Sequence, residues 1–177
     1  MRNKLLLAVF TFSLMGLAAQ AQTALKIGYA DVEYILSKMP EAKQVQADLE
    51  ATNTQLQNQL QSKIQEYEQK LQAYQQGAAT MLDAVRQDKE AELTQLQQRI
   101  QKFQTDAQTS LQEKQAKLMQ PLYEKLGNTI EALAKEESFT HILNGQLGGV
   151  DIVLYADEKY DVSDKILKKM GVEVAAN

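Results

Sequence analysis

The single histidine of this chain, His141, is the first residue to consider for chemistry, because histidine is the usual acid–base group and metal ligand near neutral pH. With one histidine per chain, we expect neither a His-based catalytic triad nor a multi-histidine metal site within one copy. The residues two positions away on either side, Phe139 and Leu143, are apolar. This pattern favours a packed or interfacial imidazole.

A run of carboxylates near the C-terminus is the second candidate, since closely spaced carboxylates can bind Ca²⁺. Its members are Asp157, Glu158, Asp161 and Asp164. A calcium loop also needs a central glycine and a closing glutamate, and this run has neither. It therefore predicts a solvated turn followed by a helix cap.

The remaining candidates for chemistry are equally weak. The glycine-rich stretch Gly145–Gly149 is not followed by a helical pattern, so it indicates a hairpin connection rather than a phosphate-binding loop. Asp88, Lys89 and Glu92 are typical of a solvated helix face. The absence of cysteine excludes disulfides, thiolate metal sites and lipid attachment through cysteine. We therefore predict no catalytic, cofactor-binding or metal-binding residue, and a protein that is not an enzyme.

The segment from Pro40 to Lys135 dominates the chain. Apolar residues recur in it every three or four positions, with glutamine and charged residues between them, which is the stripe of a coiled coil. A stripe this narrow seals one helix against one partner. Its residues are Val45, Leu49, Leu56, Leu60, Ile64, Tyr67 and Leu71 in the first half, and Leu93, Leu96, Ile100, Phe103, Ala107 and Leu111 in the second.

The two halves of the stripe are predicted to pair with each other. Helix propensity falls around Gly77, so we expect the chain to reverse near residue 82, with a tip at residues 78–86. In that antiparallel register Leu71 faces Leu93, and Leu60 faces Phe103. The alternative is one continuous rod of about 95 residues, about 140 Å long at about 1.5 Å per residue.

The N-terminus is typical of a cleaved secretory leader. Arg2 and Lys4 precede an apolar run of about 13 residues, where a membrane span needs about 20. Small residues end the run, so we predict a signal peptide, residues 1–21, cut after Ala21, and a mature protein that begins at Gln22 in an extracytoplasmic space, without stable membrane insertion. Loss of two positive charges changes the net charge from −4 to about −6, which disfavours nucleic acid as a partner.

The arm comprises residues 40–120. The residues on either side of it, 22–39 and 121–177, are expected to form a small α/β body. Pro121 predicts a kink where the arm enters the body, and the return helix should end at 136–138. The fold class is therefore α+β, dominated by a long antiparallel helical hairpin hanging from a small β-sheet body. The body elements are predicted as strand Lys26–Ala30, helix Val32–Met39 capped by Asp31, strand Phe139–Asn144, strand Val150–Tyr155, and helix Asp164–Met170 ended by Gly171.

The body is small enough to need a partner. It has about 60 residues, near the lower limit for a solitary core, so oligomerisation is expected to supply burial. The strand Val150–Tyr155 is apolar on both faces and needs cover on both. Because the arm stripe is used between its own helices, we place the interface in the body, at Ile27, Tyr29, Ile152 and Leu154.

The order of these elements resembles the Skp/OmpH family of periplasmic chaperones over about residues 25–171. The matching segments are Lys26–Asp31, Val150–Asp157 and Asp161–Lys169. The resemblance implies homotrimers whose bodies join through their sheets, with three hairpins around a cavity that holds unfolded outer-membrane proteins. This chain differs in charge, since it is acidic where well-known members are strongly basic.

Two functions follow from these predictions. The first is an ATP-independent holdase that encloses unfolded outer-membrane proteins, and the alternative is an envelope spacer or tether that uses the hairpin as a rigid arm. For the holdase, the apolar residues left over at the tip are the candidates for client contact: Tyr74, Met81, Leu82 and Val85. The same side chains could instead simply close the end of the hairpin.

Overall fold

The computed structural model describes residues 25–173. The predicted signal peptide, residues 1–21, lies outside this range. Among the described residues, no helix combines the length and the apolar character needed to cross a bilayer.

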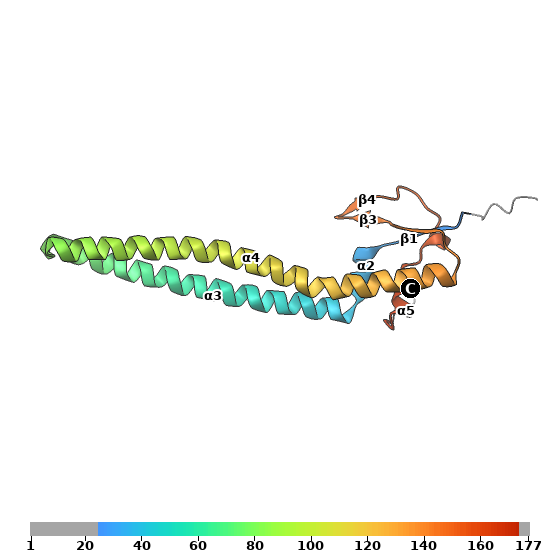
Figure 1. The fold of residues 1–177 in the computed structure, drawn as a ribbon, viewed down its shortest axis with the longest axis horizontal. Coiled ribbons are helices and arrows are strands. Elements are labelled where there is room, and N and C mark those ends of the chain that lie inside the picture. The colour runs from blue at the N-terminus through green and yellow to red at the C-terminus, as the bar shows by residue number, and fades with distance from the viewer. Residues whose placement is uncertain (1–24, 174–177) are drawn as a thin grey trace, which may run out of the picture.

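A two-helix hairpin forms the long part of the molecule (Figure 1). Helix α3, Pro40–Gly77, starts with its proline at the first helical position, where the missing N–H costs nothing. A short 3-10 helix, Ala78–Thr80, follows, and α4, Asp83–Glu136, runs back to the body. The predicted reversal is thus confirmed, and the continuous rod is wrong.

The cross-arm contacts agree with the predicted register. Leu60 and Phe103, which were expected to face each other, line one cavity between α3 and α4. Nearer the tip, Lys70 forms an ion pair with Glu92, one position from the predicted partner layer of Leu71 and Leu93. The stripe therefore determines how the two helices align.

The sheet of the body is smaller than predicted and is connected differently. Strand β1, Ile27–Ala30, pairs in parallel with β2, His141–Asn144, and Ile27 lies opposite His141. Between them in the chain, α2, Val32–Lys38, begins at Asp31, whose side chain accepts a hydrogen bond from the Tyr34 N–H at 2.9 Å. Strand β2 begins two residues later than predicted, because Phe139 packs against the core instead.

The predicted third strand, Val150–Tyr155, is largely wrong. Only Val150–Asp151 forms a strand, β4, and it pairs with β3, Gln146–Leu147, inside the stretch expected to be the turn. The turn itself is Gly148–Gly149, with φ angles of 61° and 76° that favour glycine. The Ile152 and Val153 N–H groups donate to the Gly145 carbonyl. The rest of this segment pairs with no strand among residues 25–173.

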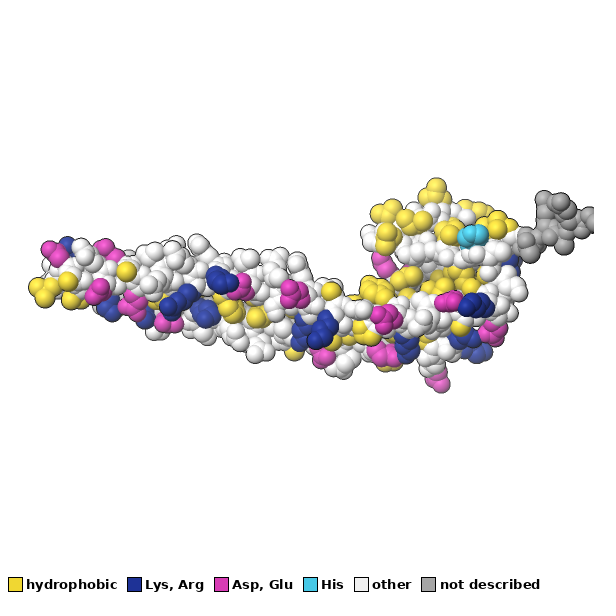
Figure 2. All heavy atoms as spheres, in the orientation of Figure 1, with side chains coloured by type: hydrophobic (Ala, Val, Ile, Leu, Met, Phe, Trp, Pro, Cys, Tyr) yellow, Lys and Arg dark blue, Asp and Glu magenta, His cyan; other side chains and the backbone are white. Residues whose placement is uncertain are grey.

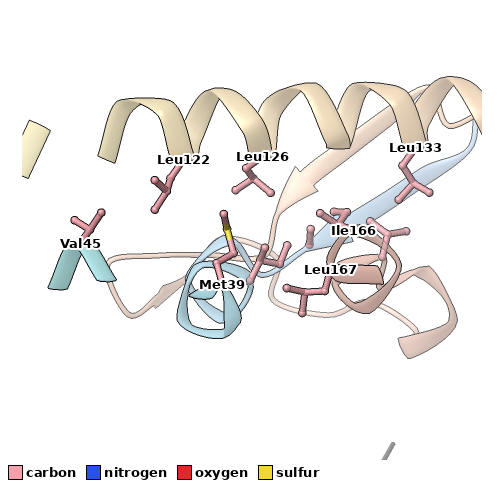
Figure 3. Close-up of a cluster of buried hydrophobic side chains, with 10 residues drawn as sticks. Met39, Val45, Leu122, Leu126, Leu133, Ile166 and Leu167 are labelled. Atoms are coloured by element: carbon pink, nitrogen blue, oxygen red, sulfur yellow. The ribbon is translucent and has the colours of Figure 1, made fainter. Parts of the chain in front are cut away.

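The C-terminal elements close the core. After a 3-10 helix, Glu158–Tyr160, helix α5 spans Ser163–Lys169 and starts one residue earlier than predicted. Gly171 follows with φ 79°, as expected for a helix stop. In Figure 3, side chains from α4 point toward Met39 and toward α5. The buried cluster contains Ala30, Ile35, Met39, Val45, Leu122, Leu126, Leu133, Val162, Ile166 and Leu167.

Helix α4 belongs to both parts of the molecule. Its first part lines the arm, and its last part covers the body, where Leu122, Leu126 and Leu133 are buried. Pro121 lies inside the helix without ending it. Figure 1 shows α4 changing direction where it passes from the arm to the body. A bend at this place is what Pro121 predicted.

Candidate functional site

The carboxylates considered for metal binding instead make hydrogen bonds within the fold. Asp157 accepts a hydrogen bond from the Lys159 N–H at 3.1 Å, and Asp161 accepts one from the Ser163 N–H at 2.8 Å. The Asp164 carboxylate accepts one from the Tyr34 hydroxyl at 3.1 Å. These contacts agree with the predicted turn, but the predicted cap of the last helix is wrong, because the N-cap position of α5 is Val162 and has no side-chain cap bond. Over residues 25–173, no group of three His, Asp or Glu side chains is arranged to bind a metal ion.

His141 does not pack inside the chain. Its side chain is exposed, so the expectation of a packed imidazole is wrong. An imidazole at an interface between copies stays a prediction. Strand β2 alternates, so that Ile142 packs on the core while His141 and Leu143 are exposed. Figure 2 shows the imidazole surrounded by hydrophobic side chains of the body.

These exposed hydrophobic side chains form what we call the apolar body surface. They come from β1, β2, the β3–β4 hairpin and the segment that follows it. Leu154, with 91% of its surface exposed, is the most open of them. The set consists of Ile27, Leu143, Leu147, Val150, Ile152, Leu154, Tyr155 and Tyr160. Within residues 25–173, no second layer of chain covers this surface.

Two adjoining cavities lie in this surface. The larger, of about 660 Å³, lies against β1 and β2, and the smaller, of about 390 Å³, extends toward Gly145. Tyr29 lines both cavities. Partial burial, together with the carboxylates of Asp161, Glu158 and Asp157, raises the pKa of Tyr29, so its phenol stays neutral. The larger cavity is therefore lined mostly by apolar and tyrosine side chains, with Lys26 at its edge. The smaller one is mixed, because Asp31, Asp151 and Asp161 also line it.

The four predicted interface residues are all placed at this surface. Ile27 and Tyr29 line the larger cavity, Leu154 lines the smaller, and Ile152 is exposed beside them on the chain. The prediction did not include five exposed residues of this surface: Leu143, Leu147, Val150, Tyr155 and Tyr160. Alternation along β2 would have indicated Leu143, whereas Leu147 was hidden because its stretch was assigned to a turn.

The tip of the hairpin is the second candidate surface. Met81 is half-buried, and its Cε lies 2.8 Å from the position that a Cβ on Gly77 would occupy. Leu82 and Val85, by contrast, are 77% and 43% exposed. Tyr74 is held in place, because its hydroxyl donates to Glu90 across the two helices, and this bond raises the pKa of Tyr74. The four predicted tip residues therefore separate into a pair that packs and a pair that is exposed.

The walls of the arm between the tip and the body are polar. Lys70 and Lys89 both contact Glu92, and they lower the pKa of that carboxyl, with Lys70 the larger cause. At the base, Lys125 pairs with Glu41. Surface ion pairs of this kind contribute little to stability, about 0–1 kcal/mol each. The walls thus carry charges of both signs near the tip and at the base.

Comparison with known proteins identifies one family and one fold. The model of the family described as outer membrane protein (OmpH-like) matches residues 26–170. A solved structure, that of a proposed outer membrane chaperone (OmpH-like) from Caulobacter crescentus CB15, is similar with a TM-score of 0.72 and 14% sequence identity. The alignment covers 86% of this chain and 89% of that one. Among curated proteins, none matches significantly.

Proposed function

The chain belongs to the family of OmpH-like outer membrane proteins, and on that premise we propose that it is an ATP-independent holdase chaperone of the periplasm. It binds unfolded outer-membrane proteins between helical arms and prevents their aggregation. The family supports a chaperone role in general and agrees with the expectation that the protein is not an enzyme. The mechanism and the class of client are the parts that we propose.

The observation that carries this proposal is the arm. Helix α3 has 38 residues, which corresponds to about 57 Å at about 1.5 Å per residue. Along that length the walls are polar, and exposed apolar side chains gather at the tip and on the body. A long surface with many weak contact points suits a client that has no fixed shape.

We propose that the working form is a homotrimer joined through the apolar body surface. The support is that Ile152 and Leu154 are exposed and that the segment containing them pairs with no strand in the described part of the chain. Ile27 and Tyr29, on β1, lie at the adjoining cavity. Joined bodies would direct several arms around a common space, which one arm alone cannot enclose.

Enclosure would keep one client molecule from aggregating with other client molecules. Unfolded strands of a membrane barrel carry unpaired backbone N–H and C=O groups, which pair readily with another chain and aggregate. A cavity between arms separates each client from the others while leaving its backbone solvated. Because each contact is weak, the client can leave without nucleotide hydrolysis.

Light scattering tests the holdase activity directly. A urea-denatured outer-membrane barrel is diluted into buffer with and without the protein, and no nucleotide is added. We expect suppression of aggregation at a roughly stoichiometric ratio of homotrimer to barrel. Aggregation as fast as in buffer alone would reject the holdase function.

Cross-linking in the cell envelope distinguishes the holdase from a spacer or tether. A holdase should give a mixture of barrel proteins, since it recognises an unfolded state rather than one surface. A spacer should give one dominant partner. N-terminal sequencing of the protein isolated from the cell envelope checks the predicted cleavage after Ala21.

The tip gives a separate prediction about client contact. We expect Leu82→Ser to lower client affinity while the arms stay fully helical, because this side chain is exposed and makes few contacts of its own. Met81→Ser should instead lower the melting temperature of the arms, because Met81 packs over Gly77. Circular dichroism and a client titration measure the two effects. Unchanged affinity in Leu82→Ser with folded arms would move client binding to the walls of the cavity.

A further inference from the structure

The seam between the two arm helices is unevenly filled. Toward the tip, Leu93 and Leu96 are buried, with 9% and 8% of their surface exposed. Midway along the arm the stripe residues are only half-buried, and a cavity of about 290 Å³ opens between the helices. We call it the mid-arm groove. It is lined by Asn53, Leu56, Gln57, Leu60, Phe103, Gln104, Ala107, Gln108 and Leu111.

The cause of the groove is one small side chain. Ala107 occupies a stripe position whose neighbours on the same helix, Phe103 and Leu111, are large. Alanine has a single methyl group there, so in the register that places Leu60 against Phe103, the residue opposite Ala107, Leu56, lacks a large apolar partner. A closed coiled coil would fill the position with a larger residue.

The lining has a defined chemistry. Its floor is aliphatic and aromatic, whereas its rim consists of four neutral amides, Asn53, Gln57, Gln104 and Gln108. Each amide both donates and accepts hydrogen bonds, which matches the peptide group of any sequence. The lining residues are all uncharged, and the Lys63 ammonium lies 5.2 Å from the ring centroid of Phe103. The groove is therefore suited to an apolar group flanked by peptide bonds.

The size of the groove limits what can enter. An engineered apolar cavity of about 150 Å³ binds benzene, so about 290 Å³ accommodates one aromatic ring or branched aliphatic side chain. The lining covers only about two turns of each helix, from Asn53 to Leu60 and from Phe103 to Leu111. A helix from a second copy would need a longer apolar stripe. An extended chain needs only one pocket for each inserted side chain.

We propose that the mid-arm groove binds one aromatic or branched aliphatic side chain of an extended polypeptide, while the rim amides hydrogen-bond the peptide groups on either side. This proposal rests on the holdase function and adds a defined contact point to it. Strands of membrane barrels alternate apolar and polar residues, so one side chain would enter the groove while its neighbours point away.

Filling the groove tests the proposal. We expect Ala107→Leu to keep the melting temperature of the arms or raise it, because the added carbons occupy empty space, and to weaken client binding about tenfold. The matched control is Ala116→Leu, which adds the same carbons at an exposed position of α4 outside the groove. Binding is measured by fluorescence anisotropy with a labelled ten-residue peptide that alternates tyrosine or leucine with serine.

A second peptide separates the groove from other contacts. When its tyrosines and leucines are replaced by alanine, we expect about tenfold weaker binding to the parent protein and no further loss with Ala107→Leu. If Ala107→Leu disturbs the helices, Ala107→Val, which adds fewer carbons, must show the same direction of effect. Parent-like affinity in both variants, with helical arms, overturns the proposal.

Three further outcomes are distinguishable. If the parent protein fails to hold a denatured barrel, the holdase function itself fails. If the parent holds the barrel and Ala107→Leu holds it equally well, the groove proposal alone fails. A change in sedimentation caused by Ala107→Leu would show that the groove is an interface between copies of this chain, and this also overturns the proposal.

Discussion

Leu154→Asp is expected to dissociate the homotrimer into folded monomers, and Ile152→Asp to do the same. Leu154 is 91% exposed in the single chain, so the substitution leaves the core intact and the helical content should not change. In the assembly, each copy would carry an uncompensated buried charge, at a cost of about 3–5 kcal/mol. Analytical ultracentrifugation at several protein concentrations measures the loss.

Leu82→Asp is the matched control for this experiment. It places the same charge at an exposed leucine of the tip, 77% exposed, on an arm that we do not assign to the interface. We expect this variant to sediment like the parent protein. If Leu82→Asp dissociates the oligomer and Leu154→Asp does not, the interface lies in the arms.

Deletion of residues 56–107, with a short turn joining the stumps, is expected to abolish the holding of denatured barrels while the oligomer stays intact. Leu56 and Ala107 line the same groove, so the two cut ends lie close together and a short turn can connect them. The buried cluster from Ala30 to Leu167 lies outside the deleted segment. Scattering and sedimentation on the same sample measure both properties.

The deletion has its own internal control. Loss of holding is informative only if the shortened protein melts cooperatively and sediments as the parent oligomer does. A shortened protein that assembles and still suppresses aggregation would place client binding on the body. A shortened protein that no longer assembles would contradict the assignment of the interface to the body.

Several features of this fold could be predicted from the sequence because they depend on local periodicity. The stripe from Val45 to Leu111 requires two helices that face each other, and the interruption at Gly77 leaves one place for the reversal. The register follows, since a shift would move apolar residues out of the seam. Pro40 and Gly171 marked helix ends correctly, because their backbone preferences act within a few residues.

The body was harder to predict because its strands depend on partners far away in the chain. An alternating pattern indicates which face of a strand is apolar, but it does not identify the neighbouring strand. The sequence therefore suggested a hairpin between the second and third strands, whereas β2 pairs with β1 across more than a hundred residues. The apolar run Val150–Tyr155 has the pattern of a full strand, yet after Asp151 no strand of residues 25–173 pairs with it.

The candidate binding surfaces were likewise predictable only in part from the sequence. Residues 74–85 indicated that the tip carries apolar side chains. Only the tertiary structure showed that Met81 packs over Gly77 whereas Leu82 is exposed. The mid-arm groove likewise needs two helices side by side before one alanine becomes a cavity. Helices and their pairing follow from short-range spacing along the chain. Exposure and cavities follow from which distant atoms fill the remaining space, and only the three-dimensional packing decides that.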